Sequence, residues 1–179
     1  MSLFYVFGGL FSGKSQAAEN LICSFSGRRL YAATMEKESF YAREKIKKHR
    51  VQRQGKGFFT IEEERDLSKV KAQKEDLVLL EDLGNLLANG LFTKEGLVSF
   101  PQKVTEEVFS AIISLKKKCK HLVVVGNDIF HTTEQISPES RCYREALFSL
   151  HRKLLSRAIA LEVIYGQILY AKEGLRCLC

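Results

Sequence analysis

The sequence predicts an α/β fold of three layers, in which helices flank a mainly parallel central sheet. Three features lead to this class: short apolar runs recur along the chain, longer stretches with helical spacing separate them, and turn residues stand between the two. Short strands that alternate with helices are typical of βαβ units, whose strands run parallel. With 179 residues, the chain fits a single domain, residues 1–179.

Five apolar runs form the expected strands. They cover residues 3–7 (LFYVF), 30–34 (LYAAT), 77–81 (LVLLE), 122–125 and 163–171. The third run is apolar until its final carboxylate, as expected of a strand that is covered on both faces of a sheet.

The expected helices fill the intervals between these runs. They are residues 15–25, residues 36–50, residues 62–73, a stretch that starts at Ser99 and Pro101 and continues to residue 115, and a long helix from Ser137 and Pro138. A serine followed by proline is typical of a helix start, because the hydroxyl caps a free N–H and proline needs no hydrogen bond there.

The composition excludes several kinds of protein. The 28 Lys and Arg outnumber the 21 Asp and Glu, and the net charge of +7 favours an anionic partner. No RNA-binding aromatic motif or zinc-finger spacing accompanies this charge, so we expect no nucleic-acid partner.

The N-terminal run lacks the flanks of a signal peptide, and no stretch is apolar enough to span a bilayer. We therefore expect a cytoplasmic protein, which also suits five cysteines without C-x-x-C pairs.

A glycine-rich loop, GGLFSGKS, lies at residues 8–15 between the first expected strand and helix. It satisfies the phosphate-binding pattern G-x-x-x-x-G-K-[ST] in the required context. Its N–H groups and the positive end of the next helix would form a cradle for phosphate oxygens. The expected nucleotide-binding residues are Gly8, Gly9, Ser12, Gly13, Lys14 and Ser15. The fold is thus expected to be P-loop NTPase-like; the alternative is an ordinary glycine turn with an exposed lysine.

The chemistry of such a site needs a cation and a second carboxylate. Lys14 would neutralise charge on the β- and γ-phosphates, and the Ser15 hydroxyl would bind Mg²⁺. Glu81, at the end of LVLLE, is the best candidate for a carboxylate that binds the metal or the attacking hydroxyl, and Asp82 is the alternative.

These motifs together resemble the bifunctional adenosylcobinamide kinase and adenosylcobinamide-phosphate guanylyltransferase family over most of the chain. The residues that carry the resemblance are the loop above, Ala18-Glu19, Tyr31-Ala32-Ala33-Thr34, Ile46, His49, Arg50, Arg53, Thr60 with Glu62 or Glu63, Leu79-Leu80-Glu81 and Asn89-Gly90-Leu91-Phe92. The last segment corresponds to a helix in the family.

The resemblance implies two reactions. ATP or GTP phosphorylates the aminopropanol hydroxyl of adenosylcobinamide, and GMP then passes from GTP to adenosylcobinamide phosphate through a guanylylated histidine, which matches His49. Further nucleotide contacts are implied at Thr34, Arg50, Arg53 and Glu62. The family also implies a homotrimer.

From the residues alone, His49 is a solvated residue of a charged helix. If that segment is helical, Lys45 and Arg53 lie one turn to either side and would lower the pKa of the imidazole, which keeps it neutral and nucleophilic. The other histidines, His121, His131 and His151, are expected to be structural or to lie on the surface.

The chain departs from the family pattern at several positions. Phe11 replaces a usual arginine, Phe58 or Phe59 a tryptophan, Asn127-Asp128 stand without the usual glycine pair, and His151-Arg152-Lys153 lie where Asn-Gln is expected. Asp128 is a candidate to replace a glutamate of the family, and Arg144 is a candidate to replace the family's helix arginine as a phosphate contact. These departures leave two alternatives open: an enzyme with only one half-reaction, or a non-catalytic nucleotide-binding subunit.

Overall fold

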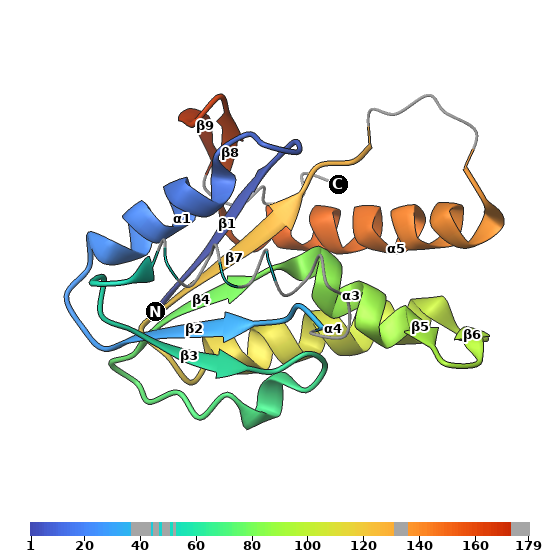
Figure 1. Cartoon of the computed structure of the whole chain (residues 1–179), viewed down its shortest axis with the longest axis horizontal. Coiled ribbons are helices and arrows are strands. Elements are labelled where there is room, and N and C mark those ends of the chain that lie inside the picture. The colour runs from blue at the N-terminus through green and yellow to red at the C-terminus, as the bar shows by residue number, and fades with distance from the viewer. Residues whose placement is uncertain (37–43, 45–46, 48–50, 52, 131–135, 173–179) are drawn as a thin grey trace.

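The computed structural model describes residues 1–36, 44, 47, 51, 53–130 and 136–172. It confirms the predicted α/β class: a seven-stranded, mainly parallel sheet has helices on both faces (Figure 1). The strand order across the sheet is β3-β2-β4-β7-β1-β8-β9. Every strand except β9 runs parallel to its neighbours, so their carboxyl ends share one edge.

The apolar runs LFYVF, LYAAT and LVLLE form strands where the sequence predicts them. The strands of the main sheet are β1 (Ser2–Gly8), β2 (Arg29–Ala33), β3 (Phe58–Glu62), β4 (Leu77–Glu81), β7 (His121–Asn127), β8 (Ile159–Ile164) and β9 (Gln167–Lys172). All five residues of β4 are buried, because this strand lies between neighbours and under helices on both faces.

Two of the longer helices in the described chain begin at residues whose side chains cap them. The helices are α1 (Lys14–Cys23), the short 3₁₀ helix η1 (Leu67–Lys69), α3 (Leu83–Leu91), α4 (Pro101–Lys116) and α5 (Pro138–Leu155); β5 (Phe92–Thr93) and β6 (Gly96–Leu97) form a small hairpin. The Asp82 carboxylate caps α3 and the Ser137 hydroxyl caps α5. Ser99 is not the cap of α4, since Phe100 holds that position without a side-chain bond.

The predicted helix at residues 62–73 is wrong. Residues 58–62 form edge strand β3, and one 3₁₀ turn is the only helix in the interval. The Glu63 carboxylate accepts hydrogen bonds from the N–H groups of Arg65 and Asp66, which closes a turn directly after the strand. The predicted helix 36–50 falls almost entirely outside the described residues.

The predicted single strand at residues 163–171 is also wrong. Tyr165 and Gly166 have φ angles of 49° and 77°, and this two-residue turn folds β9 back against β8. Paired positive φ angles are typical of a type I′ hairpin, for which glycine is the favoured residue.

Two apolar cores cover the two faces of the sheet. Alternate residues of the central strands pack against α3, α4 and α5 on one face, and the residues between them pack against α1 on the other. Tyr31 and Leu79 belong to the α1 face, so Glu81, two residues after Leu79, also points to that face. No helix in the described part of the chain is long and apolar enough to cross a membrane.

Candidate functional site

The glycine loop connects β1 to α1 at the carboxyl edge of the sheet. Gly13 has a φ of 86°, which permits the sharp entry into α1. The Lys14 side chain is only 8% exposed, and its Nζ donates a hydrogen bond to the Gly9 carbonyl at 3.0 Å. The ammonium group therefore lies over the loop, unlike the exposed lysine of an ordinary glycine turn.

Two neighbouring strands hold this loop in place. The Gly166 N–H, in the β8–β9 turn, donates to the Ser12 carbonyl at 2.6 Å, and the Asp128 N–H, just after β7, donates to the Gly8 carbonyl at 2.9 Å. Phe11, at the tip of the loop, is 91% exposed with a φ of 59°. The base of the loop is thus fixed by backbone contacts, whereas its tip presents an aromatic side chain to solvent.

The predicted carboxylate Glu81 is buried at the end of β4. Its Oε2 accepts a hydrogen bond from the Tyr31 hydroxyl at 3.0 Å. Burial, and then the nearby Glu81 charge, raise the pKa of Tyr31, so the phenol remains a proton donor to the carboxylate. The other side of this tyrosine carries Arg53, whose guanidinium carbon lies 3.4 Å from the ring centroid.

Arg53 is a predicted nucleotide contact whose side chain is buried beside a cleft. It is 6% exposed, and its Nη1 has no hydrogen-bond partner within the described parts of the chain. The same residue lines a cleft of about 460 Å³ that Gln54, Gly55, Gly57, Phe58 and Thr60 complete. A buried guanidinium with an unused N–H beside a cleft is suited to binding an anion.

The remaining predicted residues have different surroundings. Glu62 is exposed at the end of β3, and Ala33 of β2 pairs with both Glu62 and Glu81, so the two carboxylates flank one β2 residue across the sheet. His49 and Arg50 lie outside the described residues, so their roles stay predictions. Phe58 packs against Tyr31 and Phe59 is exposed on the edge strand; which of the two replaces the family tryptophan stays open.

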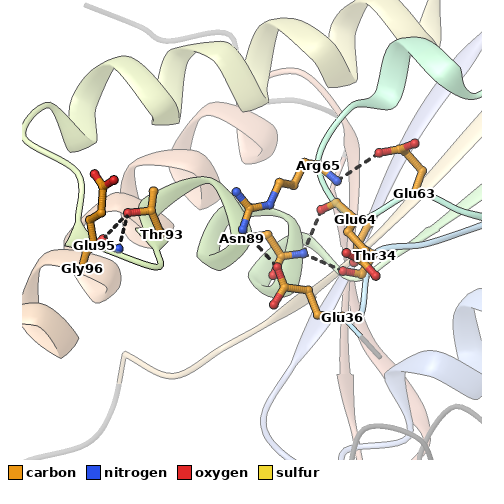
Figure 2. Close-up of polar contacts among 9 residues, drawn as sticks. All are labelled: Thr34, Glu36, Glu63, Glu64, Arg65, Asn89, Thr93, Glu95 and Gly96. Carbon is orange, nitrogen blue, oxygen red and sulfur yellow. Dashed lines mark hydrogen bonds and ion pairs between the residues drawn. The ribbon is translucent and has the colours of Figure 1, made fainter. Parts of the chain in front are cut away.

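Thr34 is buried and bonded within the protein (Figure 2). Its hydroxyl donates to the Asp82 carbonyl and accepts from the Asp82 N–H, both at 2.8 Å. The Asn89 amide donates at 2.8 Å to the carbonyls of Thr34 and Glu64. These bonds connect the ends of β2 and β4 with α3 and the segment after β3; the nucleotide contact of Thr34 remains a prediction.

The opposite face of the same edge contains Asp82, Asn127 and Tyr143. The Asn127 amide lies 3.5 Å from the Asp82 carboxylate, and a side chain added at Gly84 would meet the Tyr143 hydroxyl at 2.7 Å. The Asp82 carboxylate also accepts from the Asn85 N–H, so Asp82 caps a helix here. This geometry favours Glu81 over Asp82 as the carboxylate of the α1 face.

His151 is buried, which the sequence does not distinguish from a surface position. Its Nδ1 lies 3.1 Å from the Tyr5 hydroxyl, and its ring packs edge-on against Phe7 and Phe130. Burial lowers the pKa of this imidazole, while Asp128 opposes the shift. The prediction of a structural role agrees with these contacts.

Two residues of the site had no assigned role in the sequence: Tyr31, which joins Arg53 to Glu81, and Lys56, which forms an ion pair with Glu19. Tyr31 belongs to the YAAT motif, which predicts that it lies on a strand but does not predict which residues it contacts. No local pattern indicates the pair of Glu19 and Lys56, because 37 positions separate them.

The site fits a magnesium ion by the chemistry of its donors. Mg²⁺ takes oxygen ligands, usually one or two from the protein with phosphates and water completing the shell. Ser15 in the first turn of α1 and Glu81 on the α1 face are the residues that would hold it. Within the described residues no cluster of three His, Cys, Asp or Glu that could hold a metal ion is present.

The sheet order, the helices on both faces and the loop between β1 and α1 define the class of the protein: a P-loop NTPase-like α/β fold. Within that class, the chain belongs to the cobinamide kinase / cobinamide phosphate guanyltransferase family, whose sequence model matches residues 4–168 of 179. The resemblance found in the motifs is thereby confirmed. Membership makes the protein a transferase of cobalamin biosynthesis with nucleotide and cobinamide substrates. A comparison with curated proteins finds no match.

Proposed function

We propose that the protein carries out both reactions of its family. It phosphorylates the hydroxyl of adenosylcobinamide with ATP or GTP, and it transfers GMP from GTP to adenosylcobinamide phosphate through a guanylylated His49. The product is adenosylcobinamide-GDP. The observation that carries this proposal is the fixed loop with its buried Lys14, at the same sheet edge as Glu81.

In the phosphorylation step, the substrate hydroxyl attacks the γ-phosphorus, the nucleoside diphosphate leaves, and the hydroxyl proton passes to a base. The loop N–H groups and Lys14 bind the phosphates and balance the charge that moves onto the leaving oxygen. Mg²⁺, held by Ser15 and Glu81, would neutralise further phosphate charge when bound. The Tyr31 hydroxyl donates to Oε2 of Glu81 and so keeps this carboxylate oriented.

In the transfer step, a neutral His49 nitrogen attacks the α-phosphorus of GTP and pyrophosphate leaves. The phosphate oxygen of the second substrate then attacks the same phosphorus, and the histidine leaves with its nitrogen regenerated. Arg53 supports this proposal, since it follows His49 by four residues and packs on Tyr31, the partner of Glu81. Arg50, Arg53, Thr34 and Glu62 would complete the nucleotide contacts.

The test is a covalent adduct. After incubation with α-labelled GTP and Mg²⁺, the protein is expected to carry acid-labile GMP, which mass spectrometry locates on His49. A His49→Ala protein should bind GTP but acquire no label. His121→Ala is the matched control, because His121 begins β7 at the opposite edge of the sheet and stacks on Phe25. Equal labelling of the His49→Ala protein would contradict the assignment.

One observation favours a second candidate, an enzyme with a single half-reaction. Phe11 stands exposed at the tip of the loop where the family usually has arginine, so the loop lacks a cation at this position. Assays with adenosylcobinamide and with its phosphate, run separately, distinguish the cases, since formation of one product without the other leaves one half-reaction. GTP-dependent stabilisation without turnover or adduct would instead indicate a nucleotide-binding subunit.

The proposal includes a homotrimer in the cytoplasm. Light scattering coupled to gel filtration is expected to give three times the chain mass of 20.4 kDa. A monomer at micromolar concentration would contradict this part of the proposal and leave the chemistry to be judged by the adduct experiment.

A further inference from the structure

A buried ion pair connects the loop helix to the segment that follows His49. Glu19 of α1 has a fully buried side chain, and its Oε2 lies 2.5 Å from Nζ of Lys56. Its Oε1 has no hydrogen-bond partner among the residues that the structure describes. Among the described residues, Lys56 is therefore the cation that compensates this buried carboxylate.

Residues 53–56 form a turn with two further attachments on the same face of the sheet. Arg53 lies on the Tyr31 ring, and the Lys56 N–H donates to the Arg53 carbonyl at 3.1 Å. Arg29 donates to the Lys56 carbonyl and, with another nitrogen, to the carbonyls of Cys23 and Phe25 at the end of α1. This turn is thus held between β2 and the helix that begins with Lys14.

Stability alone does not account for such a pair. A buried ion pair commonly stabilises a fold no better than two apolar side chains of similar size, because both charges lose their hydration. The pair instead fixes geometry. Because the Lys56 ammonium must stay within hydrogen-bond range of one Glu19 oxygen, the turn at residues 53–56 is held at a defined place beside α1. Glu19 is five residues from Lys14, or about 7.5 Å along a rigid helix.

We propose that Glu19 and Lys56 are positioning residues for guanylyl transfer: their ion pair sets the position of the His49 segment relative to the phosphate loop. The inference rests on the proposed function, in which His49 reaches the α-phosphorus of GTP bound at that loop. Neither residue touches the nucleotide; each acts through the turn at residues 53–56. The phosphorylation step does not use His49 and does not depend on the pair.

The test replaces both charges at once, so that no buried charge is left alone. In a Glu19→Met/Lys56→Met protein, the first-order rate of GMP-adduct formation at saturating GTP should fall between tenfold and about a hundredfold, the cost of a small misplacement of reacting groups. The GTP concentration for half-maximal rate should change less than about threefold, because Lys14 and the loop are intact. Phosphorylation of adenosylcobinamide should keep its rate.

Two controls separate positioning from general damage. Glu106→Met/Lys153→Met makes the same substitutions in an ion pair of 2.8 Å between α4 and α5, on the opposite face, and should leave both rates unchanged. Lys56→Arg keeps a cation beside Glu19 and should retain most of the labelling rate. A double Met variant at 19 and 56 that labels as fast as the parent overturns the inference.

The outcome also distinguishes this inference from the proposed function. A parent protein that forms no adduct overturns the transfer reaction and the positioning role together, whereas a labelled parent with an equally fast double variant overturns the positioning role alone. If the double variant does not fold, Glu19→Gln gives the same comparison: slower labelling at unchanged half-saturation supports the role, and an unchanged rate overturns it.

Discussion

At the scale of single residues, His151 shows how burial sets the behaviour of a titratable group. The imidazole lies between the Tyr5 hydroxyl and the rings of Phe7 and Phe130, where it is 8% exposed. A neutral imidazole can accept a hydrogen bond from the Tyr5 hydroxyl at Nδ1, whereas protonation would turn that nitrogen into a donor and bury a charge. Its pKa is lowered from the ordinary 6.5 for this reason, with Asp128 opposing the shift.

This lowered pKa predicts acid sensitivity. Between the lowered pKa of the folded protein and the ordinary 6.5, the unfolded chain binds more protons at His151 than the folded chain, so stability decreases as the pH decreases through this window. Within that window the free energy of unfolding falls by at most about 1.4 kcal/mol per pH unit for this one proton. His151→Gln keeps an acceptor for Tyr5 and should flatten the dependence, measured as denaturant midpoints between pH 7.5 and 5. A variant that loses stability as steeply as the parent would show that other groups cause the effect.

At the scale of elements, Asn89 of α3 connects the helix to the ends of two neighbouring strands, β2 and β3. Its amide bonds to the carbonyls of Thr34 and Glu64, which end β2 and follow β3 (Figure 2). Asn89→Ala leaves two buried acceptors without this donor and should lower the free energy of unfolding by about 2–4 kcal/mol. Asn20→Ala, on the exposed face of α1, should change it by less than about 0.5 kcal/mol. Equal effects in chemical denaturation would contradict the assigned role of Asn89.

The phosphate loop and the β8–β9 turn should be sensitive to each other. A Cβ at Gly13 would lie 2.8 Å from Gly166 Cα, and the φ of 86° is strained for any other residue. Gly13→Ala should therefore cost about 1–3 kcal/mol of stability. Gly9→Ala meets nothing within 4 Å and has no positive φ, so its melting temperature should stay near that of the parent. A Gly13→Ala protein as stable as Gly9→Ala would exclude this close contact.

The same elements show what the sequence could and could not predict. The order strand, glycine loop, helix at residues 2–23 follows from local patterns, because burial on both faces and loop chemistry act on neighbouring residues. β3 was missed because it is an edge strand with half of its side chains in solvent, so its pattern is weak. Contacts such as Tyr31 to Glu81 and Glu19 to Lys56 depend on which strands are neighbours, which no local pattern specifies.

At the scale of the whole molecule, the parallel sheet brings distant segments to one edge and divides them between two faces. Glu81, Tyr31, Arg53 and the pair of Glu19 and Lys56 belong to the α1 face, where the proposed nucleotide chemistry takes place. Asp82 and Tyr143 belong to the face covered by α3 and α5. The polar contacts of Asp82 on that second face connect the ends of β4 and β7 with α3.

Nucleotide binding should be measurable as stability of the whole chain, since the loop is bonded to both β7 and the β8–β9 turn and the sheet unfolds with it. GTP with Mg²⁺ at a hundred times its Kd should add about 2.7 kcal/mol. For a domain of this size, that raises the melting temperature by about 5–10 °C. Lys14→Ala should remove most of this shift, because it removes the cation over the loop, while His49→Ala should keep it. A full shift in the Lys14→Ala protein would mean that GTP binds elsewhere on this basic chain.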